Sequence, residues 1–198
     1  MTPIITTEKV LRPRADHDHY PTPPELARAA LDQLPYMNYP ESVLDAGCGS
    51  GVWGQAARDK WGYSFILDGV DIRDVGTPAG YSEVYQLDYV TEPVYGTYDV
   101  VIGNPPYKHA EEFVRNSLAN VFDGGYVVFL LRLAFLEGQA RMTGLWREHP
   151  PLHVSVLGAR PSFTGNGKTD ATAYAVYIWR KGYDDETTLS WLDWKGVR

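Results

Sequence analysis

The sequence is poor in cysteine, with Cys48 alone among 198 residues. A single thiol excludes an intramolecular disulfide and a zinc site built from several cysteines. No apolar run approaches the roughly 20 residues that span a bilayer, and residues 1–19 contain no apolar stretch of the signal-peptide type. We therefore expect a cytoplasmic protein with no metal site and no membrane contact.

Positive charge is also scarce. There are 18 Lys and Arg residues against 25 Asp and Glu residues, a net charge of -7, so the chain does not coat nucleic acid through its overall charge. The hydrophobic content of 44% predicts a packed core, and the length fits a single domain. We expect residues 1–19 to be a flexible lead-in and residues 20–198 to form one folded unit.

Strand-like and helix-like patterns alternate along most of the chain. This alternation is typical of a Rossmann-like α/β domain with a mostly parallel sheet and helices on both faces. The last two strands are joined by a polar loop, which predicts an antiparallel hairpin at one edge of a seven-stranded sheet. The predicted strands are residues 43–46, 65–72, 84–87, 98–102, 126–131, 154–157 and 173–179, and the predicted helices are residues 22–34, 52–60, 110–122 and 134–146.

A glycine-rich segment, VLDAGCGSG, connects the first strand to a helix. Gly47, Gly49 and Gly51 permit a tight turn and a close approach of the backbone to a ligand. The spacing differs from the G-x-G-x-x-G dinucleotide motif, and no G-K-[ST] follows as in a P-loop. Asp45 places a carboxylate at the strand end, which disfavours a pyrophosphate and suits a neutral or cationic ligand.

Acidic residues also end the next two strands. Asp71 closes the second strand, where a carboxylate commonly accepts hydrogen bonds from the two hydroxyls of a ribose. Asp88 ends the third strand and could accept a hydrogen bond from an adenine amino group, with Tyr89 covering the ring. A solvated loop acid is an equally good interpretation of Asp88.

These motifs, DAGCGSG, VDI and LDY at successive strand ends, resemble the S-adenosylmethionine site of class I methyltransferases. The resemblance covers residues 20–180. The tetrapeptide Y-P-T-P at residues 20–23 resembles the N-terminal motif of adenine methyltransferases, which contacts the methionine end of the cofactor. The resemblance therefore implies S-adenosyl-L-methionine as cofactor, held by Tyr20, Thr22, Pro23, Asp45, Gly47, Gly49, Asp71, Asp88, Tyr89 and Asn104.

The strand YDVVIG runs into the most specific motif of the chain, Asn104-Pro105-Pro106-Tyr107. Two consecutive prolines remove two N–H donors and restrict the backbone to a stiff turn. The Asn104 side-chain oxygen and the Pro105 carbonyl could accept both N–H groups of a planar amine, and Tyr107 offers a ring face. Catalysis would then rest on positioning and electrostatic preorganisation.

N-P-P-Y is similar to the catalytic motif of N6-adenine and N4-cytosine DNA methyltransferases. It also resembles motifs of glutamine N5-methyltransferases and of RNA base methyltransferases. The resemblance implies a DNA adenine-N6 methyltransferase of the compact form found in phages and prophages, with RNA adenine and protein glutamine as alternatives. Glutamine enzymes carry an extra N-terminal helical domain, and only about 40 residues precede the glycine loop here. A non-catalytic subunit is disfavoured by the intact motif.

The loop at residues 158–172 lies between the last two predicted strands. In the enzymes that the chain resembles, an aromatic residue of this loop stacks on the flipped base opposite the Tyr of N-P-P-Y. Phe163 is the matching residue, although it could instead pack against its own hairpin. Arg160 and Lys168 belong to a segment with five cationic and two acidic residues, a candidate contact for nucleic-acid phosphates. No separate target-recognition domain is expected, which argues against strong sequence specificity.

Overall fold

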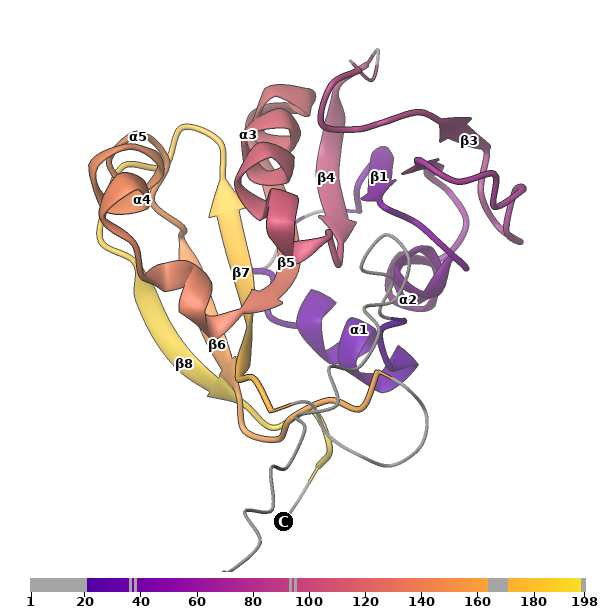
Figure 1. Cartoon of the computed structure of the whole chain (residues 1–198). Coiled ribbons are helices and arrows are strands. Elements are labelled where there is room, and N and C mark those ends of the chain that lie inside the picture. The colour runs from indigo at the N-terminus through magenta and orange to yellow at the C-terminus, as the bar shows by residue number, and fades with distance from the viewer. Residues whose placement is uncertain are drawn as a thin grey trace, which may run out of the picture.

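The computed structural model describes residues 21–35, 37, 39–92, 94, 96–163 and 171–196. They form one eight-stranded sheet in the order β3-β2-β1-β4-β5-β7-β6-β8 (Figure 1). Only β7 among these strands is antiparallel to its neighbours β5 and β6. The Rossmann-like α/β class is therefore confirmed. The strands are β1 Ser42–Ala46, β2 Ile66–Asp71, β3 Glu83–Gln86, β4 Tyr98–Gly103, β5 Val121–Arg132, β6 His153–Leu157, β7 Tyr174–Arg180 and β8 Thr188–Leu192.

The eighth strand corrects the expected count of seven and moves the hairpin away from the edge. Strand β8 lies parallel to β6, with Leu189 opposite Val154 and Leu192 opposite Leu157. The strand has no continuous buried face, because Leu189 and Trp191 are exposed and Leu192 is buried. The pairing with β6, rather than a buried stripe in its own sequence, holds β8 in place.

Helices cover both faces of the sheet. Helices α1 (Pro24–Leu31) and α2 (Val52–Trp61) pack on one face, and α3 (Ala110–Asn120) packs on the other. Along β5, Val128 and Leu130 belong to the first core cluster, whereas Val127 and Phe129 belong to the second. This alternation follows from the two-residue period of a strand. None of the described helices is both long and apolar enough to cross a membrane.

The predicted helix at residues 134–146 is not continuous. It divides into a 3-10 turn at Leu133–Leu136, helix α4 at Gln139–Thr143 and helix α5 at Leu145–Glu148. Gly138 has φ 122°, which no helix accepts, and Gly144 separates the two short helices. The predicted helix at residues 110–122 also ends early, because β5 begins at Val121.

Strands β1, β2 and β4 are parallel neighbours, so their carboxyl ends form one edge of the sheet, and in Figure 1 the end of β4 lies close to α1. The glycine loop follows β1, Asp71 closes β2, and the N-P-P-Y turn follows β4. Strands β1 and β4 approach closely there, since a Cβ at Gly103 would come within 2.5 Å of the Ala46 carbonyl oxygen. This edge brings the predicted motifs together.

Candidate functional site

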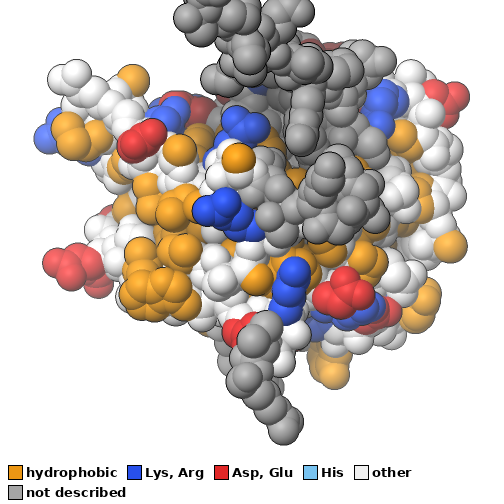
Figure 2. Space-filling model, turned by 60° about the horizontal axis from the view of Figure 1, so that its bottom comes forward, with side chains coloured by type: hydrophobic (Ala, Val, Ile, Leu, Met, Phe, Trp, Pro, Cys, Tyr) orange, Lys and Arg blue, Asp and Glu red, His pale blue; other side chains and the backbone are white. Residues whose placement is uncertain are grey.

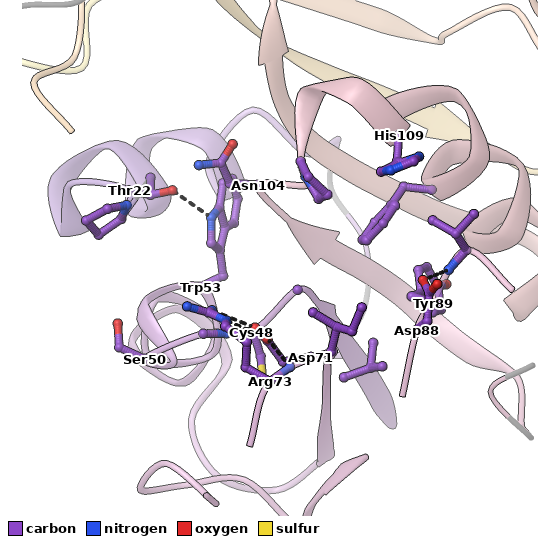
Figure 3. Close-up of a pocket in the computed structure, with 18 of the residues that line it drawn as sticks. Thr22, Cys48, Ser50, Trp53, Asp71, Arg73, Asp88, Tyr89, Asn104 and His109 are labelled. Carbon is purple, nitrogen blue, oxygen red and sulfur yellow. Dashed lines mark hydrogen bonds and ion pairs between the residues drawn. The ribbon is translucent and has the colours of Figure 1, made fainter. Parts of the chain in front are cut away.

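A cavity of about 400 Å³ lies at the carboxyl ends of β1, β2 and β4 (Figure 3). Its volume is within the range of small-molecule sites. Glycine backbone, carboxylates and apolar side chains share its wall. The lining residues are Pro21, Thr22, Gly47, Cys48, Gly49, Ser50, Val52, Trp53, Val70, Asp71, Ile72, Arg73, Asp88, Tyr89, Val90, Asn104, Pro106, Lys108, His109 and Phe113.

The glycine loop is anchored to the end of β2. The backbone N–H groups of Gly47 and Cys48 both donate to the Val70 carbonyl, at 2.8 and 3.0 Å. Gly47, Gly49 and Gly51 have φ angles of 78°, 51° and 84°, in the left-handed region that favours glycine. The loop thereby presents bare backbone to the cavity.

Asp71 and Arg73 form a side-chain pair at the end of β2. The Asp71 side chain is only 5% exposed and accepts hydrogen bonds from the Arg73 Nε at 2.9 Å and the Gly49 N–H at 2.9 Å. Burial acts to raise the pKa of Asp71, but the hydrogen bonds and charge of Arg73 hold it below its ordinary value. Figure 3 shows this pair on the side of the cavity opposite Thr22 and Asn104.

Asp88 and Tyr89 form the wall beyond β3. The Asp88 carboxylate accepts from the Val90 N–H at 3.0 Å and from the Thr91 hydroxyl at 3.1 Å, so it caps a turn while facing the cavity. The Tyr89 ring is buried and lies edge-on against Phe113, with its hydroxyl 3.2 Å from Ser117. Helix α3 therefore holds Tyr89 as part of the wall.

Asp45 does not line the cavity, which corrects its predicted contact with a cofactor. Its side chain is fully buried behind the glycine loop, where one oxygen accepts from the Gly54 N–H and the Tyr81 hydroxyl. Burial raises the pKa of the Asp45 carboxyl to about 7, although these two hydrogen bonds act to lower it. The carboxyl group joins α2 to Tyr81 and has a structural position.

This shifted pKa makes a testable contribution to stability. The folded protein holds one more proton than the unfolded chain between about pH 4 and about pH 7, so the free energy of unfolding falls as pH rises through that window. We expect Asp45→Asn to remove this dependence, which reaches about 1.4 kcal/mol per pH unit. Urea denaturation of both proteins across the window measures the difference. If the free energy of unfolding depends on pH in the same way in both proteins, Asp45 is ionised throughout this window.

The N-P-P-Y turn is divided between the cavity and the core. Asn104 and Pro106 line the cavity, while Pro105 is buried. The Tyr107 ring lies outside the cavity wall, 4.8 Å from the Arg132 guanidinium carbon and 5.6 Å from the Tyr174 ring. Burial raises the pKa of the Tyr107 hydroxyl well above its ordinary value, and Tyr174 adds to this effect.

The N-terminal motif is placed differently from the expectation. Helix α1 begins at Pro24, two residues after the predicted start, and its N-cap Pro23 does not line the cavity. Thr22 is buried in the cavity wall, and its hydroxyl accepts a hydrogen bond from the Trp53 indole N–H at 3.1 Å. Tyr20 lies outside the described residues.

Phe163 and Arg160 do not line the cavity. Phe163 is 6% exposed and packs edge-on against Tyr174, with ring centroids 5.1 Å apart. This position favours the alternative that Phe163 packs against its own hairpin, because the buried ring does not face the cavity. Arg160 is exposed, and Lys168 lies outside the described residues.

On the face drawn in Figure 2, the described Lys and Arg side chains form no continuous basic patch. The Arg141 Nε donates to the Phe135 carbonyl at 2.9 Å, which holds this side chain over its own loop. Figure 2 shows Lys and Arg side chains as separate groups among apolar ones, outside the grey atoms. Within the described part of the chain, no three His, Cys, Asp or Glu side chains cluster in a way that could hold a metal ion.

Several lining residues were not predicted from the sequence. Trp53 stands in the first turn of α2, Arg73 two residues after Asp71, and Phe113 on the face of α3 that meets Tyr89. Lys108 and His109 follow N-P-P-Y directly. Proximity to a motif was the only available signal for Trp53, Arg73, Lys108 and His109, whereas Phe113 depends on how α3 packs.

Comparison with known proteins places this geometry in a fold family. No family model and no curated protein matches the sequence. A putative class I S-adenosylmethionine-dependent methyltransferase from Listeria monocytogenes is similar with a TM-score of 0.65 at 16% identity, over 89% of this chain and 66% of that chain. The methyltransferase subunit of a type I restriction-modification system from Streptococcus thermophilus has a TM-score of 0.66 at 18% identity, over 83% and 45%.

A putative RNA methyltransferase from Pyrococcus horikoshii is also similar, with a TM-score of 0.62 at 15% identity over 86% of this chain and 90% of that chain. The chain thus spans 66% of the Listeria protein and less than half of the Streptococcus subunit. At these identities the likeness concerns the fold. The chain therefore has the α/β fold of class I methyltransferases.

Proposed function

We propose that this protein is an S-adenosylmethionine-dependent methyltransferase that methylates a planar amine, namely N6 of adenine in DNA. The observation that carries the proposal is that one cavity is lined both by the glycine loop with Asp71 and Asp88 and by Asn104 of N-P-P-Y. A ligand seated against the first group would lie directly beside the second. The cofactor and the amine would therefore share one site.

The residues of the cavity fit the cofactor. Bare backbone at Gly47 and Gly49 leaves room for the methionine part near Thr22, and Asp71 supplies acceptors for a ribose diol. Apolar side chains around Asp88 suit a flat adenine ring. The Asp88 carboxylate could accept a hydrogen bond from the amino group of that ring. These apolar residues are Ile72, Val90 and Phe113.

Asp71→Ala is expected to weaken cofactor binding by roughly 1.5–3 kcal/mol, the range for hydrogen bonds to a charged group. Titration calorimetry with S-adenosylhomocysteine measures the change. Asp74→Ala is the matched control, because Asp74 is exposed, lies three residues further on and does not line the cavity. Equal affinity in wild type and Asp71→Ala would remove Asp71 from the binding site.

The bound cofactor would supply an electrophilic methyl group, and the chain would position the amine. An exocyclic adenine nitrogen is a weak nucleophile because its lone pair is delocalised into the ring. Asn104 lines the cavity, and its carboxamide would bind this nitrogen and favour a geometry with the lone pair available. Pro105 is buried, so contact of its carbonyl with the second N–H would require a movement of the turn. No strong base is needed, since the nitrogen loses its proton readily only after methylation. The rate enhancement would come from positioning and preorganised dipoles.

DNA adenine is favoured as substrate because the chain combines N-P-P-Y with the Y-P-T-P tetrapeptide at residues 20–23, which resembles the N-terminal motif of adenine methyltransferases. RNA adenine offers the same amine, and the similar structures include proteins described as acting in restriction-modification and on RNA. Protein glutamine also presents a planar nitrogen. The three polymers are therefore outcomes of one experiment.

The test is methyl transfer from labelled S-adenosylmethionine to duplex DNA, RNA and a glutamine-containing protein in parallel, followed by nucleoside analysis. Label in N6-methyladenine from DNA is the expected result. Label in RNA or protein alone would retain the amine chemistry and change the substrate. No transfer to any polymer, with cofactor bound, would contradict the proposed activity.

A further inference from the structure

The Asp71 carboxylate has a partner at each of its acceptor positions. A carboxylate offers about four lone-pair sites. Oδ1 accepts from the backbone N–H of Arg73 at 3.0 Å and from its Nε at 2.9 Å. Oδ2 accepts from the Gly49 N–H at 2.9 Å and from the Arg73 Nη2 at 3.0 Å. The side chain of Arg73 thus occupies one site on each oxygen, in the bidentate geometry typical of Arg–carboxylate pairs.

The Arg73 guanidinium differs from the two backbone donors because it can rotate away from the Asp71 carboxylate. The Gly49 and Arg73 N–H groups belong to the backbone and are fixed by the loop. The guanidinium stands on a side chain that is 32% exposed and lines the cavity, whereas Asp71 is 5% exposed. Rotation of the Arg73 side chain toward solvent would free two acceptor sites of Asp71, which is the number that a diol requires.

We propose that the Arg73 guanidinium is an internal competitor for the ribose site, so that the cofactor binds Asp71 only by displacing it. This inference rests on the proposed function, in which Asp71 binds the ribose. Arg73 then lowers the affinity for any ligand that carries a diol. It acts as a positioning residue on Asp71 and sets how tightly the cofactor is held.

Titration calorimetry with S-adenosylhomocysteine tests the competition without any turnover. We expect Arg73→Ala to bind about 3- to 10-fold more tightly than wild type, the gain from removing a partly screened ion pair. Arg73→Lys should fall between the two, because a lysine offers a point charge and no bidentate fork. Arg147→Ala is the matched control, since it removes the same charge from an exposed position outside the cavity.

A double-mutant cycle separates competition from a general change of charge. In an Asp71→Ala background no carboxylate remains to compete for, so Arg73→Ala should leave the affinity unchanged. Equal or weaker binding by Arg73→Ala in the wild-type background would overturn the proposal while leaving the proposed function in place. Absence of binding by wild type and every variant would contradict both. Far-ultraviolet circular dichroism confirms that each variant is folded.

Discussion

Asn104→Ala should lower the rate of methyl transfer by roughly 100-fold or more, as does loss of one preorganised polar group from other active sites. The physical reason is the position of Asn104 at the cavity wall, from which its carboxamide would contact the amine. Binding of S-adenosylhomocysteine should remain close to that of wild type, because Asp71 and the glycine loop lie on the opposite side of the cavity (Figure 3). Single-turnover kinetics and calorimetry on the same preparation measure both quantities.

Asn104→Asp is the informative companion variant. It keeps an oxygen acceptor of the same length and adds a charge, so we expect a partial loss of rate, smaller than that of Asn104→Ala. If both variants lose cofactor binding in parallel with activity, Asn104 contributes to the cofactor site rather than to the amine. If Asn104→Ala retains near-normal turnover, the proposed hydrogen bond between Asn104 and the target amine is wrong.

Phe163→Ala should lower the free energy of unfolding by about 3–5 kcal/mol, the usual cost of removing a buried phenyl ring. Phe163 is 6% exposed, packs against Tyr174 and belongs to the core cluster beneath α1 and α2. Urea denaturation measures the loss. Phe122→Ala is the control, because Phe122 is 49% exposed on β5 and its removal should cost less than about 1 kcal/mol.

The same variant distinguishes packing from stacking on a flipped base. Extrusion of a base from a duplex costs a few kcal/mol, and aromatic stacking offsets part of that cost. A stacking residue would therefore matter more for a paired adenine than for a mismatched one. We expect Phe163→Ala to reduce methylation of both substrates equally at a temperature where the variant is folded. A defect confined to paired adenine, with unchanged stability, would restore the stacking role.

Tyr107 shows how neighbours change what a motif presents. Its ring was expected to offer a free face, but the Arg132 guanidinium lies 4.8 Å from the ring centre and Tyr174 packs against it. Arg132 comes from the end of β5, and Tyr174 begins β7. The pairing of β5 with β7 therefore creates this environment, 25 or more residues away from N-P-P-Y in the sequence.

Local sequence determined the class of the fold and the position of the main motifs. Apolar runs at residues 43–46, 65–72 and 98–102 predicted parallel strands, because strands of a parallel sheet are buried on both faces. Glycines in alternation and two consecutive prolines constrain the backbone at the residues themselves. Gly47, Gly49, Asp71, Asp88 and Asn104 accordingly meet in one cavity.

Tertiary structure decided which of these side chains face the cavity and what they contact there. Asp45 and Asp71 both stand at strand ends, yet Asp45 points behind the loop to Tyr81 and Gly54, whereas Asp71 faces the cavity. Strand β8 exists through its pairing with β6. Phe163 is buried because β7 brings Tyr174 beside it. These outcomes depend on contacts between segments distant in sequence, which no local pattern contains.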